Sequence, residues 1–270
     1  MPPPAVDTVT PASGVGTIRT LDLRPAEAFA AGRVPGAVRL DPGRFNRADP
    51  PAGGLLPGPE EMRAILAEAH LAEGEPVVVL DAGGQTAAGR AVWALRAWGI
   101  ETASWLDGGW PAWVEAGGEV ERGDAPGRPL ATGEAPARLA DAPSELVTAD
   151  ELAAELGDPR LRVLDVRGAA EYAGTDVRAA RGGRVPGAIH HEWTRQLDAA
   201  GRALPAMRLR EALAALDVTP EHRVVVYCQT HQRSAVTWVL MRHAGFVDVR
   251  GLDGAWSVWG NRADLPIERG

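Results

Sequence analysis

The sequence contains a single cysteine and no lysine among its 270 residues. With one cysteine, no disulfide can form within the chain. All 28 basic residues are arginines, which excludes lysine-based Schiff-base chemistry and the lysine of a phosphate-binding P-loop. Phenylalanine and tyrosine are scarce, with three and two residues, whereas there are nine tryptophans. We therefore expect the tryptophans to fill core volume.

Long hydrophobic runs and an excess of positive charge are also missing. No stretch approaches the roughly 18 uninterrupted apolar residues of a membrane span. The net charge of −8 argues against a nucleic-acid partner. Residues 1–14 lack the basic patch and the apolar core of a secretory signal. We expect a cytoplasmic protein that keeps its thiol reduced and has neither a nucleic-acid nor a membrane partner.

Four segments occur twice in the chain, in the same order. The pairs are LDLR at 21–24 and LDVR at 164–167, GRVPGA at 32–37 and 183–188, PVVVL at 76–80 and RVVVY at 223–227, and LDGGW at 106–110 and LDGAW at 252–256. The separations are 143, 151, 147 and 146 residues, which indicates an internal duplication with an insertion of eight residues inside 170–182 of the second copy.

The duplication divides the chain into two domains and a linker. Residues 123–146 are rich in Pro, Gly and Ala and lack apolar periodicity, as is typical of a linker. The predicted domains are therefore residues 1–122 and 147–270, each of a common single-domain size.

Strand and helix patterns alternate within the second copy. Helices are predicted at 149–156, with Thr148 as N-cap, at 208–216 and at 234–244, and strands at 161–166, 187–190, 224–227 and 246–250. This alternation predicts an α/β fold in which each copy has a mostly parallel central sheet flanked by helices. Ligands of such sheets bind at the carboxyl ends of the strands, and Cys228 directly follows the strand at 224–227.

The segment from Cys228 to Ser234 reads CQTHQRS and connects this strand to the next predicted helix. A tight loop there directs backbone N–H groups inward, and the helix N-terminus and Arg233 add positive potential. These features favour a thiolate, which is the reactive form of cysteine. In the first copy Asp81 takes the position of Cys228, so that copy is expected to be inactive.

These motifs resemble those of the rhodanese family of sulfurtransferases, over about residues 15–265. The loop is close to the CQTHHRS loop of one bacterial branch of two-domain thiosulfate sulfurtransferases. The resemblance implies two tandem rhodanese-like domains, of which the second is catalytic, and a reaction without metal ion or organic cofactor. It implies that Cys228 takes a sulfur from a small anionic donor such as thiosulfate and passes it, from a persulfide, to cyanide or a thiol. The expected substrate-binding residues are Gln229, Thr230, His231, Gln232, Arg233 and Ser234.

The sequence departs from the family pattern at two positions. Gln232 replaces the second histidine of the similar loop, and Glu171 stands where animal relatives have a substrate-binding arginine. An acid there is expected to repel an anionic donor. The compensating charge is expected from three nearby arginines, with Arg184 as the candidate substrate-binding residue beside Arg178 and Arg181. Asp165 and Arg167 of LDVR are expected to be mainly structural.

Other functions fit the same residues less well. A phosphatase of related fold uses Cys-x5-Arg, whereas Cys228 and Arg233 have the spacing Cys-x4-Arg. A 3-mercaptopyruvate sulfurtransferase and a persulfide carrier that delivers sulfur to a partner protein remain alternatives. A metal site would have to use Cys228, His231, His190 and His191, which lack the spacing of zinc ligands.

Overall fold

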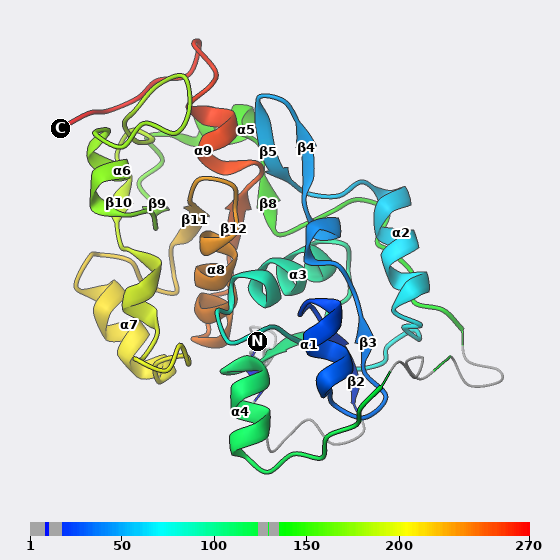
Figure 1. Ribbon diagram of the computed structural model, residues 1–270. Coiled ribbons are helices and arrows are strands. Elements are labelled where there is room, and N and C mark those ends of the chain that lie inside the picture. The colour runs from blue at the N-terminus through cyan, green and yellow to red at the C-terminus, as the bar shows by residue number, and fades with distance from the viewer. Residues whose placement is uncertain (1–8, 11–17, 124–128, 130–134) are drawn as a thin grey trace.

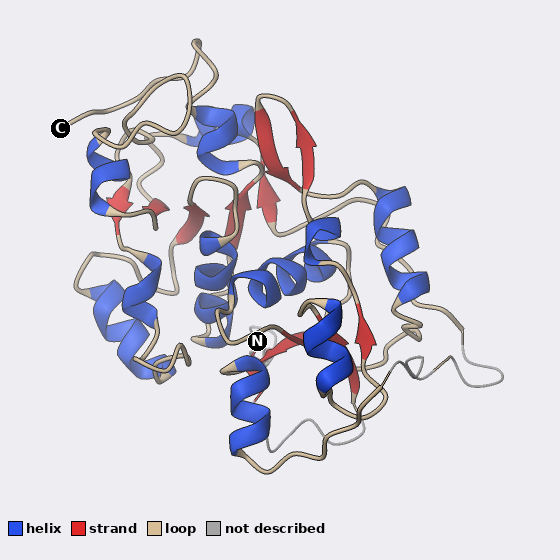
Figure 2. Ribbon diagram, viewed as in Figure 1, coloured by secondary structure: helices blue, strands red, loops and turns tan. Residues whose placement is uncertain are grey.

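The computed structural model describes residues 9–10, 18–123, 129 and 135–270 (Figures 1 and 2). This part of the chain contains two five-stranded parallel sheets. The strand order of the first is β1 (Val9–Thr10), β7 (Ala103–Leu106), β6 (Val77–Leu80), β2 (Arg19–Asp22) and β3 (Val38–Arg39). The order of the second is β8 (Leu146–Val147), β12 (Val249–Leu252), β11 (Arg223–Tyr227), β9 (Leu161–Asp165) and β10 (Ile189–His190). The two orders correspond strand by strand, so the predicted duplication and the α/β fold are confirmed.

Helices cover both faces of each sheet. In the first copy α1 (Ala26–Ala31) and α4 (Gly109–Glu115) pack on one face, and α2 (Pro59–Glu68) and α3 (Thr86–Ala97) on the other. In the second copy α5 (Ala149–Glu155) and α9 (Ala255–Trp259) face α7 (Ala206–Ala214) and α8 (Arg233–His243) across the sheet. The short helix α6 (Ala169–Ala173) follows β9. In the described part of the chain, no helix combines the length and the apolar character that crossing a membrane requires.

Helices α3 and α8 join the two copies into one core. Both are buried on nearly all sides, as expected for helices enclosed between two sheets. Gly89 permits their close approach, because a Cβ atom there would lie 3.2 Å from the Val236 Cα atom. Each helix follows the central strand of its own sheet, so this contact also fixes the loops that begin at Asp81 and Cys228. The tryptophans fill core volume as predicted, and five of them are at most 1% exposed: Trp93, Trp105, Trp238, Trp256 and Trp259.

The first copy also carries an antiparallel hairpin, formed by β4 (Arg47–Asp49) and β5 (Ala52–Leu55). It follows the 3-10 helix η2 (Pro42–Phe45), whereas the second copy has the 3-10 helix η3 (Trp193–Gln196) after β10. The hairpin reaches over to α9 of the second copy (Figure 1). It therefore brings a segment of the first copy beside the loop after β11.

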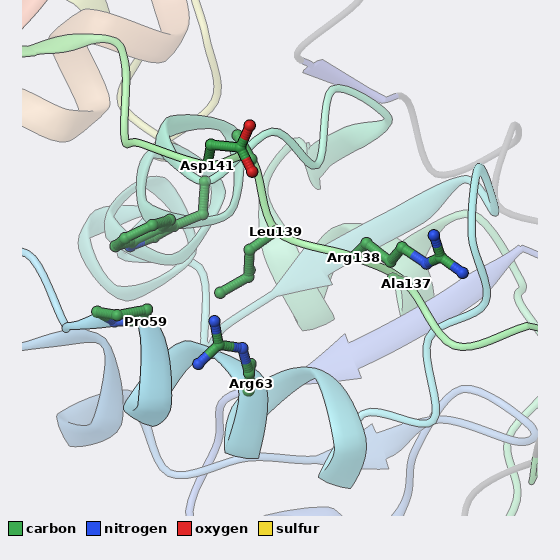
Figure 3. Close-up of a pocket in the computed structure, with 8 residues that line it drawn as sticks. Pro59, Arg63, Ala137, Arg138, Leu139 and Asp141 are labelled. Carbon is green, nitrogen blue, oxygen red and sulfur yellow. The ribbon is translucent and has the colours of Figure 1, made fainter.

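The described part of the predicted linker lies against the first copy. The amide groups of Ala137 and Ala140 donate to the carbonyl oxygens of Leu71 and Trp98, at 2.8 and 2.9 Å. Together with α2 this segment encloses a cavity of about 410 Å³ (Figure 3). Residues 124–128 and 130–134 of the predicted linker lie outside the described residues. The domain boundaries therefore stay predictions.

The predicted elements of the second copy are present, with shifted ends. Thr148 caps α5 as predicted, since its hydroxyl accepts a hydrogen bond from the Glu151 amide at 3.3 Å. The prediction of a strand at 246–250 is wrong at its start, because β12 begins at Val249. Phe246 instead completes the end of α8: its amide donates to the Met241 carbonyl after Gly245 adopts a φ of +86°. In the sequence, an apolar residue that follows a helix-ending glycine cannot be distinguished from the first residue of a strand, which explains the error at Phe246.

Candidate active site

Cys228 lies at the carboxyl end of β11, the central strand of the second sheet. Five residues later α8 begins with Arg233. The Cys228 carbonyl accepts a hydrogen bond from the Trp256 amide at 3.0 Å, and the Gln229 carbonyl accepts one from the Ser257 amide at 2.9 Å. The start of α9, which carries the repeated LDGAW motif, therefore holds the loop in place. The cysteine is 1% exposed.

Two arginines and one hydroxyl group surround the Cys228 sulfur. The Ser234 hydroxyl donates a hydrogen bond to Sγ over 3.4 Å. Arg233 of α8 and Arg90 of α3 in the first copy both interact electrostatically with Cys228. Burial lowers the pKa of Arg90 to about 10, while the charges of Asp253 and Cys228 act in the opposite direction. Arg90 therefore remains a cation at neutral pH, and both arginines favour an anionic sulfur.

The sequence drew no attention to Arg90, which lies among mostly small and apolar residues in a helix of the first copy. Its Nε and Nη2 atoms donate to the Phe45 and Leu55 carbonyl oxygens at 2.9 and 2.8 Å, and the guanidinium lies over the Trp93 ring. Nη1 is buried and finds no hydrogen-bond partner within the described part of the chain. A buried arginine in an otherwise apolar helix is a signal that sequence reading can use, because such a charge needs a reason to be there.

Glu171 pairs with Arg233 instead of lying free beside the loop. The Arg233 Nη1 and Nη2 atoms donate to the two carboxylate oxygens at 2.7 and 2.9 Å. Burial alone would raise the pKa of Glu171, but the hydrogen bonds and charge of Arg233 hold it below its ordinary value. The hydrogen bonds to Glu171 in turn raise the pKa of Arg233. The acid that was expected to repel substrate thus orients the loop arginine.

The other loop residues differ in where their side chains lie. Gln229 donates to the Arg178 carbonyl at 2.9 Å, and Gln232 donates to Asn46 Oδ1 of the first copy at 2.7 Å. Thr230 is half-buried. His231 is fully buried with a φ of +54°, and its ring packs against Trp93 with the centroids 4.2 Å apart. Its expected contact with substrate stays a prediction that this inward orientation does not favour.

The hairpin β4–β5 forms one wall of the site. A Cβ atom on Gly54 would lie 2.0 Å from the Thr230 carbonyl oxygen, so the two backbones touch. The Gly53 amide donates to Ser257 Oγ at 3.0 Å, and the Leu56 amide donates to Asp253 Oδ1 at 2.7 Å. Sequence reading assigned no role to this segment. The adjacent glycines 53 and 54 between apolar residues were its one visible sign of close backbone approach.

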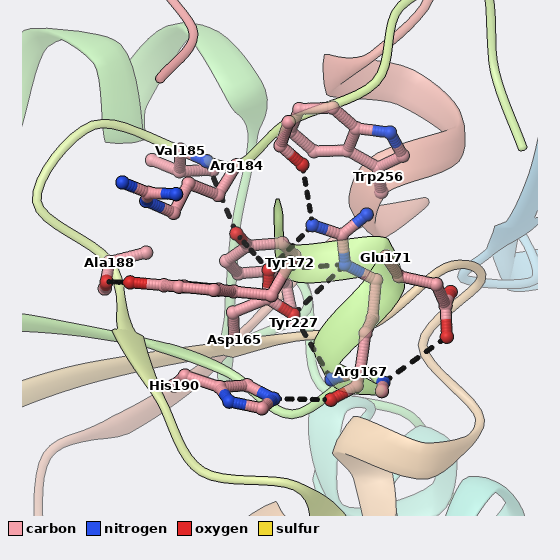
Figure 4. Close-up of polar contacts among 12 residues, drawn as sticks. Asp165, Arg167, Glu171, Tyr172, Arg184, Val185, Ala188, His190, Tyr227 and Trp256 are labelled. Carbon is pink, nitrogen blue, oxygen red and sulfur yellow. Dashed lines mark hydrogen bonds and ion pairs between the residues drawn. The ribbon is translucent and has the colours of Figure 1, made fainter. Parts of the chain in front are cut away.

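Asp165, Arg167 and Tyr227 form a buried polar cluster behind the site (Figure 4). Arg167 Nη2 and the Tyr227 hydroxyl donate to Asp165 Oδ2 at 2.6 and 2.7 Å, and Arg167 lies against the Trp256 ring. The first copy repeats the Asp–Arg pair, since Arg24 Nη2 donates to Asp22 Oδ2 at 2.6 Å. An arrangement present with and without the cysteine is structural, in agreement with the prediction for the LDVR motif.

The three candidate arginines of the insertion lie in different places. Arg184 pairs with Glu268 at 3.3 Å, donates to the Gly270 carbonyl and covers the Tyr172 ring (Figure 4). Arg181 donates to backbone carbonyl groups of the C-terminal segment. Arg178 lies beside the loop: its Nε atom is 4.0 Å from Glu171, and its backbone carbonyl accepts the hydrogen bond from Gln229. The substrate role of Arg184 stays a prediction, and its contacts tie it to the C-terminus.

The histidines that were weighed as metal ligands have other contacts. His190 donates to the Arg167 carbonyl at 2.8 Å and stacks on Tyr172, whereas His191 is buried. Burial lowers the pKa of His191 to about 4, and the charges of Arg195 and His190 act in the same direction. Among the residues that the structure describes, no three His, Cys, Asp or Glu side chains are grouped to hold a metal ion.

Asp81 occupies its own loop in the first copy. Its Oδ1 atom accepts hydrogen bonds from the Gly83 and Gln85 amides at 2.8 and 3.2 Å, and Oδ2 accepts one from the Ala88 amide at 3.2 Å. The carboxylate thus satisfies donors that would otherwise face an anion. The backbone amides of the loop after the central strand are therefore arranged to bind an anion.

A family model of the rhodanese-like domain matches the chain twice, at residues 11–116 and 148–262. A thiosulfate sulfurtransferase of Pseudomonas aeruginosa is 40% identical over 96% of this chain and 94% of its own length. One of Azotobacter vinelandii is 37% identical over 92% and 90%. A 3-mercaptopyruvate sulfurtransferase of Escherichia coli is 30% identical over 92% and 87%.

Among solved structures, an anaerobic ergothioneine biosynthesis enzyme from Chlorobium limicola superposes with a TM-score of 0.84. The superposition covers 98% of this chain and 70% of that chain, with 22% sequence identity. At this identity the likeness concerns the fold alone.

Proposed function

The chain belongs to the rhodanese-like family, and we propose that it is a sulfurtransferase that moves a sulfane sulfur from thiosulfate to cyanide or a thiol. The placement of its only cysteine carries the proposal. Cys228 directly follows the central strand of the second sheet, and the Ser234 hydroxyl lies 3.4 Å from its Sγ atom. The positive charges of Arg233 and Arg90 interact with the sulfur. A nucleophile in this position needs neither a second cysteine nor a metal ion to accept and release one sulfur atom.

In the first step the Cys228 thiolate attacks the outer sulfur of thiosulfate. A new S–S bond forms, the S–S bond of thiosulfate breaks, and sulfite leaves with its electron pair. The product is a Cys228 persulfide whose outer sulfur is anionic. Arg233 and Arg90 stabilise the anions on both sides of this step, and the helix N-terminus of α8 adds to their effect.

In the second step a thiophilic acceptor attacks the outer sulfur of the persulfide. With cyanide, a C–S bond forms, the persulfide S–S bond breaks, and thiocyanate leaves while Cys228 returns to the thiolate. A thiol acceptor gives a hydropersulfide in the same way. Because Cys228 must be a free thiolate to attack in the first step, a reducing compartment such as the cytoplasm suits the protein.

Glu171 favours 3-mercaptopyruvate as a second candidate donor. The carboxylate cancels part of the charge of Arg233 and so weakens the attraction of a dianion more than that of a monoanion. The thiolate would then attack the mercapto sulfur, the C–S bond would break, and the enolate of pyruvate would leave with the electron pair and take up the mercapto proton at its carbon. The same persulfide forms from either donor.

The experiment is intact-mass spectrometry of the protein after incubation with thiosulfate, with Cys228→Ser as the matched control. We expect the wild-type protein alone to gain one sulfur atom, and cyanide to remove it with release of thiocyanate. Since the chain has a single cysteine, the site of the added sulfur is unambiguous.

Two other outcomes have defined meanings. Loading by 3-mercaptopyruvate without loading by thiosulfate would change the donor and keep the sulfurtransferase. Loading by neither donor would contradict the proposed enzyme and would direct the search to a persulfide carrier that a partner protein loads.

A further inference from the structure

A hydrogen-bonded chain of three side chains leads from the Cys228 sulfur into the protein interior. The Ser234 oxygen lies 3.4 Å from Cys228 Sγ and 2.7 Å from His231 Nδ1. Ser234 and His231 are fully buried. The serine has a single hydrogen, so it donates either to the sulfur or to the histidine, and the protonation of His231 decides which.

His231 is held as a neutral ring in a closed space. Burial, with the charge of Arg90 in addition, holds the pKa of His231 well below its ordinary value. A Cβ atom on Gly251 would lie 2.3 Å from both Cε1 and Nε2 of the ring, so that Gly251 lies directly against this edge. The Nε2 atom is buried and has no hydrogen-bond partner among the residues that the structure describes. A neutral imidazole carries one N–H group, which must be on Nδ1 or on Nε2.

The two tautomers differ in what they leave unsatisfied. With the hydrogen on Nε2, an N–H group is buried without an acceptor, and the Ser234 hydrogen turns to Nδ1 and away from the sulfur. With the hydrogen on Nδ1, His231 donates to Ser234, and the serine hydrogen is free to donate to Sγ. The second arrangement satisfies both donors, and a buried N–H without an acceptor is the costlier defect.

We propose that His231 is a positioning residue, whose Nδ1–H group directs the Ser234 hydroxyl at the Cys228 sulfur. This inference rests on the proposed function. It names Ser234 and His231 as the residues that stabilise the thiolate form of the nucleophile Cys228. A hydrogen bond to an anionic sulfur is stronger than one to a thiol, so the chain favours the thiolate. It also assists the second step, in which Cys228 leaves as a thiolate when the acceptor takes the outer sulfur. No proton moves in either step.

Four charged residues also act at the Cys228 sulfur, and they are the same in the wild type and in the Ser234 variant. Arg233 on α8 and Arg90 on α3 act on the sulfur directly, Glu171 offsets Arg233, and Asp253 offsets Arg90. Substitution of Ser234 leaves all four of these charged residues in place. Removal of the Ser234 oxygen therefore tests the hydrogen bond to the sulfur while the nearby charges stay unchanged.

The test measures the rate of Cys228 alkylation by iodoacetamide as a function of pH. For Ser234→Ala we expect the midpoint of the profile to rise by about one pH unit, which means about tenfold less thiolate below the midpoint. The discharge of a preloaded persulfide by cyanide should slow by about tenfold as well. Ser104→Ala, which changes a buried serine of the first copy, is the matched control and should alter neither.

Variants of His231 separate positioning from packing. His231→Gly removes the donor and should raise the midpoint as Ser234→Ala does. His231→Asn places an amide N–H near the former Nδ1, and asparagine tolerates the positive φ of this position, so it should recover much of the shift. In ¹⁵N NMR spectra of the wild-type protein, the hydrogen of His231 should be on Nδ1.

The proposal fails if Ser234→Ala leaves both the thiolate fraction below the midpoint and the discharge rate within about twofold of the wild type. It also fails if the imidazole hydrogen of His231 is on Nε2. Alkylation needs no sulfur donor. A protein that accepts no sulfur but shows the shifted profile would therefore contradict the proposed function and keep the positioning role.

Discussion

Glu171 and Arg233 form a two-point ion pair at the mouth of the Cys228 loop, with N–O distances of 2.7 and 2.9 Å. The glutamate is 4% exposed, whereas the arginine side chain is 22% exposed. Each of the two guanidinium nitrogens gives the carboxylate one of its two hydrogens, and the negative charge of Glu171 offsets the positive charge that would attract a donor anion. The ion pair therefore orders the Cys228 loop but weakens the attraction of Arg233 for an incoming anion.

Glu171→Gln should lower the KM for thiosulfate. Loss of one negative charge beside the site removes a repulsion of about 1–2 kcal/mol, or about five- to thirtyfold in binding. Stability should fall by about 1 kcal/mol, a modest value because Arg233 is partly solvated. Steady-state kinetics and urea unfolding check both effects, with the exposed Glu60→Gln as control. A higher KM would show instead that the pair holds Arg233 in its productive position.

Gly54→Ala should impair the enzyme although Gly54 belongs to the first copy, which lacks the cysteine. The new Cβ atom would meet the Thr230 carbonyl oxygen at 2.0 Å and push the hairpin and the loop apart. Gly74→Ala is a matched control, because Gly74 has a similar φ, +72° against +68°, and nothing within 4 Å of the added atom.

The backbone strain is the same in both glycine variants, so their difference reports the contact alone. We expect Gly54→Ala to be less stable than Gly74→Ala by about 1–3 kcal/mol. Its kcat/KM should fall at least about tenfold. Equal activity of the two variants would mean that the hairpin does not shape the site.

Asp81→Ala should destabilise the protein without affecting sulfur loading of Cys228. Three backbone amides lose their acceptor, and buried donors without partners cost about 1–3 kcal/mol in total. Asp81→Asn keeps one oxygen acceptor and should lose less. Urea unfolding and intact-mass analysis after thiosulfate treatment check the two halves of this prediction. Loss of loading in a folded variant would contradict an inactive first copy.

His191 should make the protein less stable in mild acid. The pKa of His191 is about 4 in the folded protein, against about 6.5 when unfolded. Between these values the unfolded chain binds the extra proton, so the free energy of unfolding falls as the pH drops from about 6.5 to about 4, by about 3 kcal/mol at most.

Urea unfolding of His191→Gln at pH 7 and pH 4.5 checks this prediction. The variant should show a smaller acid loss than the wild type. The buried His231 contributes in the same direction and is present in both proteins. An identical pH dependence of the two proteins would assign the acid loss to other groups.

The fold and the position of Cys228 followed from local patterns in the sequence. The four repeated segments revealed the duplication, and the apolar run before Cys228 identified the central strand. The structural role of Asp165 and Arg167 was also correct, since both copies keep these residues whether or not a cysteine follows the central strand. Such features depend on neighbours in the sequence or on a comparison of one copy with the other.

The walls of the site could not be predicted in the same way. Asn46 and Gln232 are 186 residues apart, and Gly53 and Ser257 are 204 apart, yet both pairs are hydrogen-bonded. The charge of Glu171 was visible in the sequence, and its predicted repulsion of an anionic donor stays a prediction, but its ion pair with Arg233 was not foreseen. Which way a loop side chain points, as for His231, depends on packing between the copies.

The hairpin β4–β5 also bears on how a duplicated gene persists. A copy whose reactive residue has been replaced is ordinarily free to accumulate changes or to be deleted. Here the copy with Asp81 supplies Arg90 and the backbone of Gly54 to its neighbour. Selection on sulfur chemistry at Cys228 therefore acts on residues of both halves, and the altered half is inherited as part of the catalytic unit.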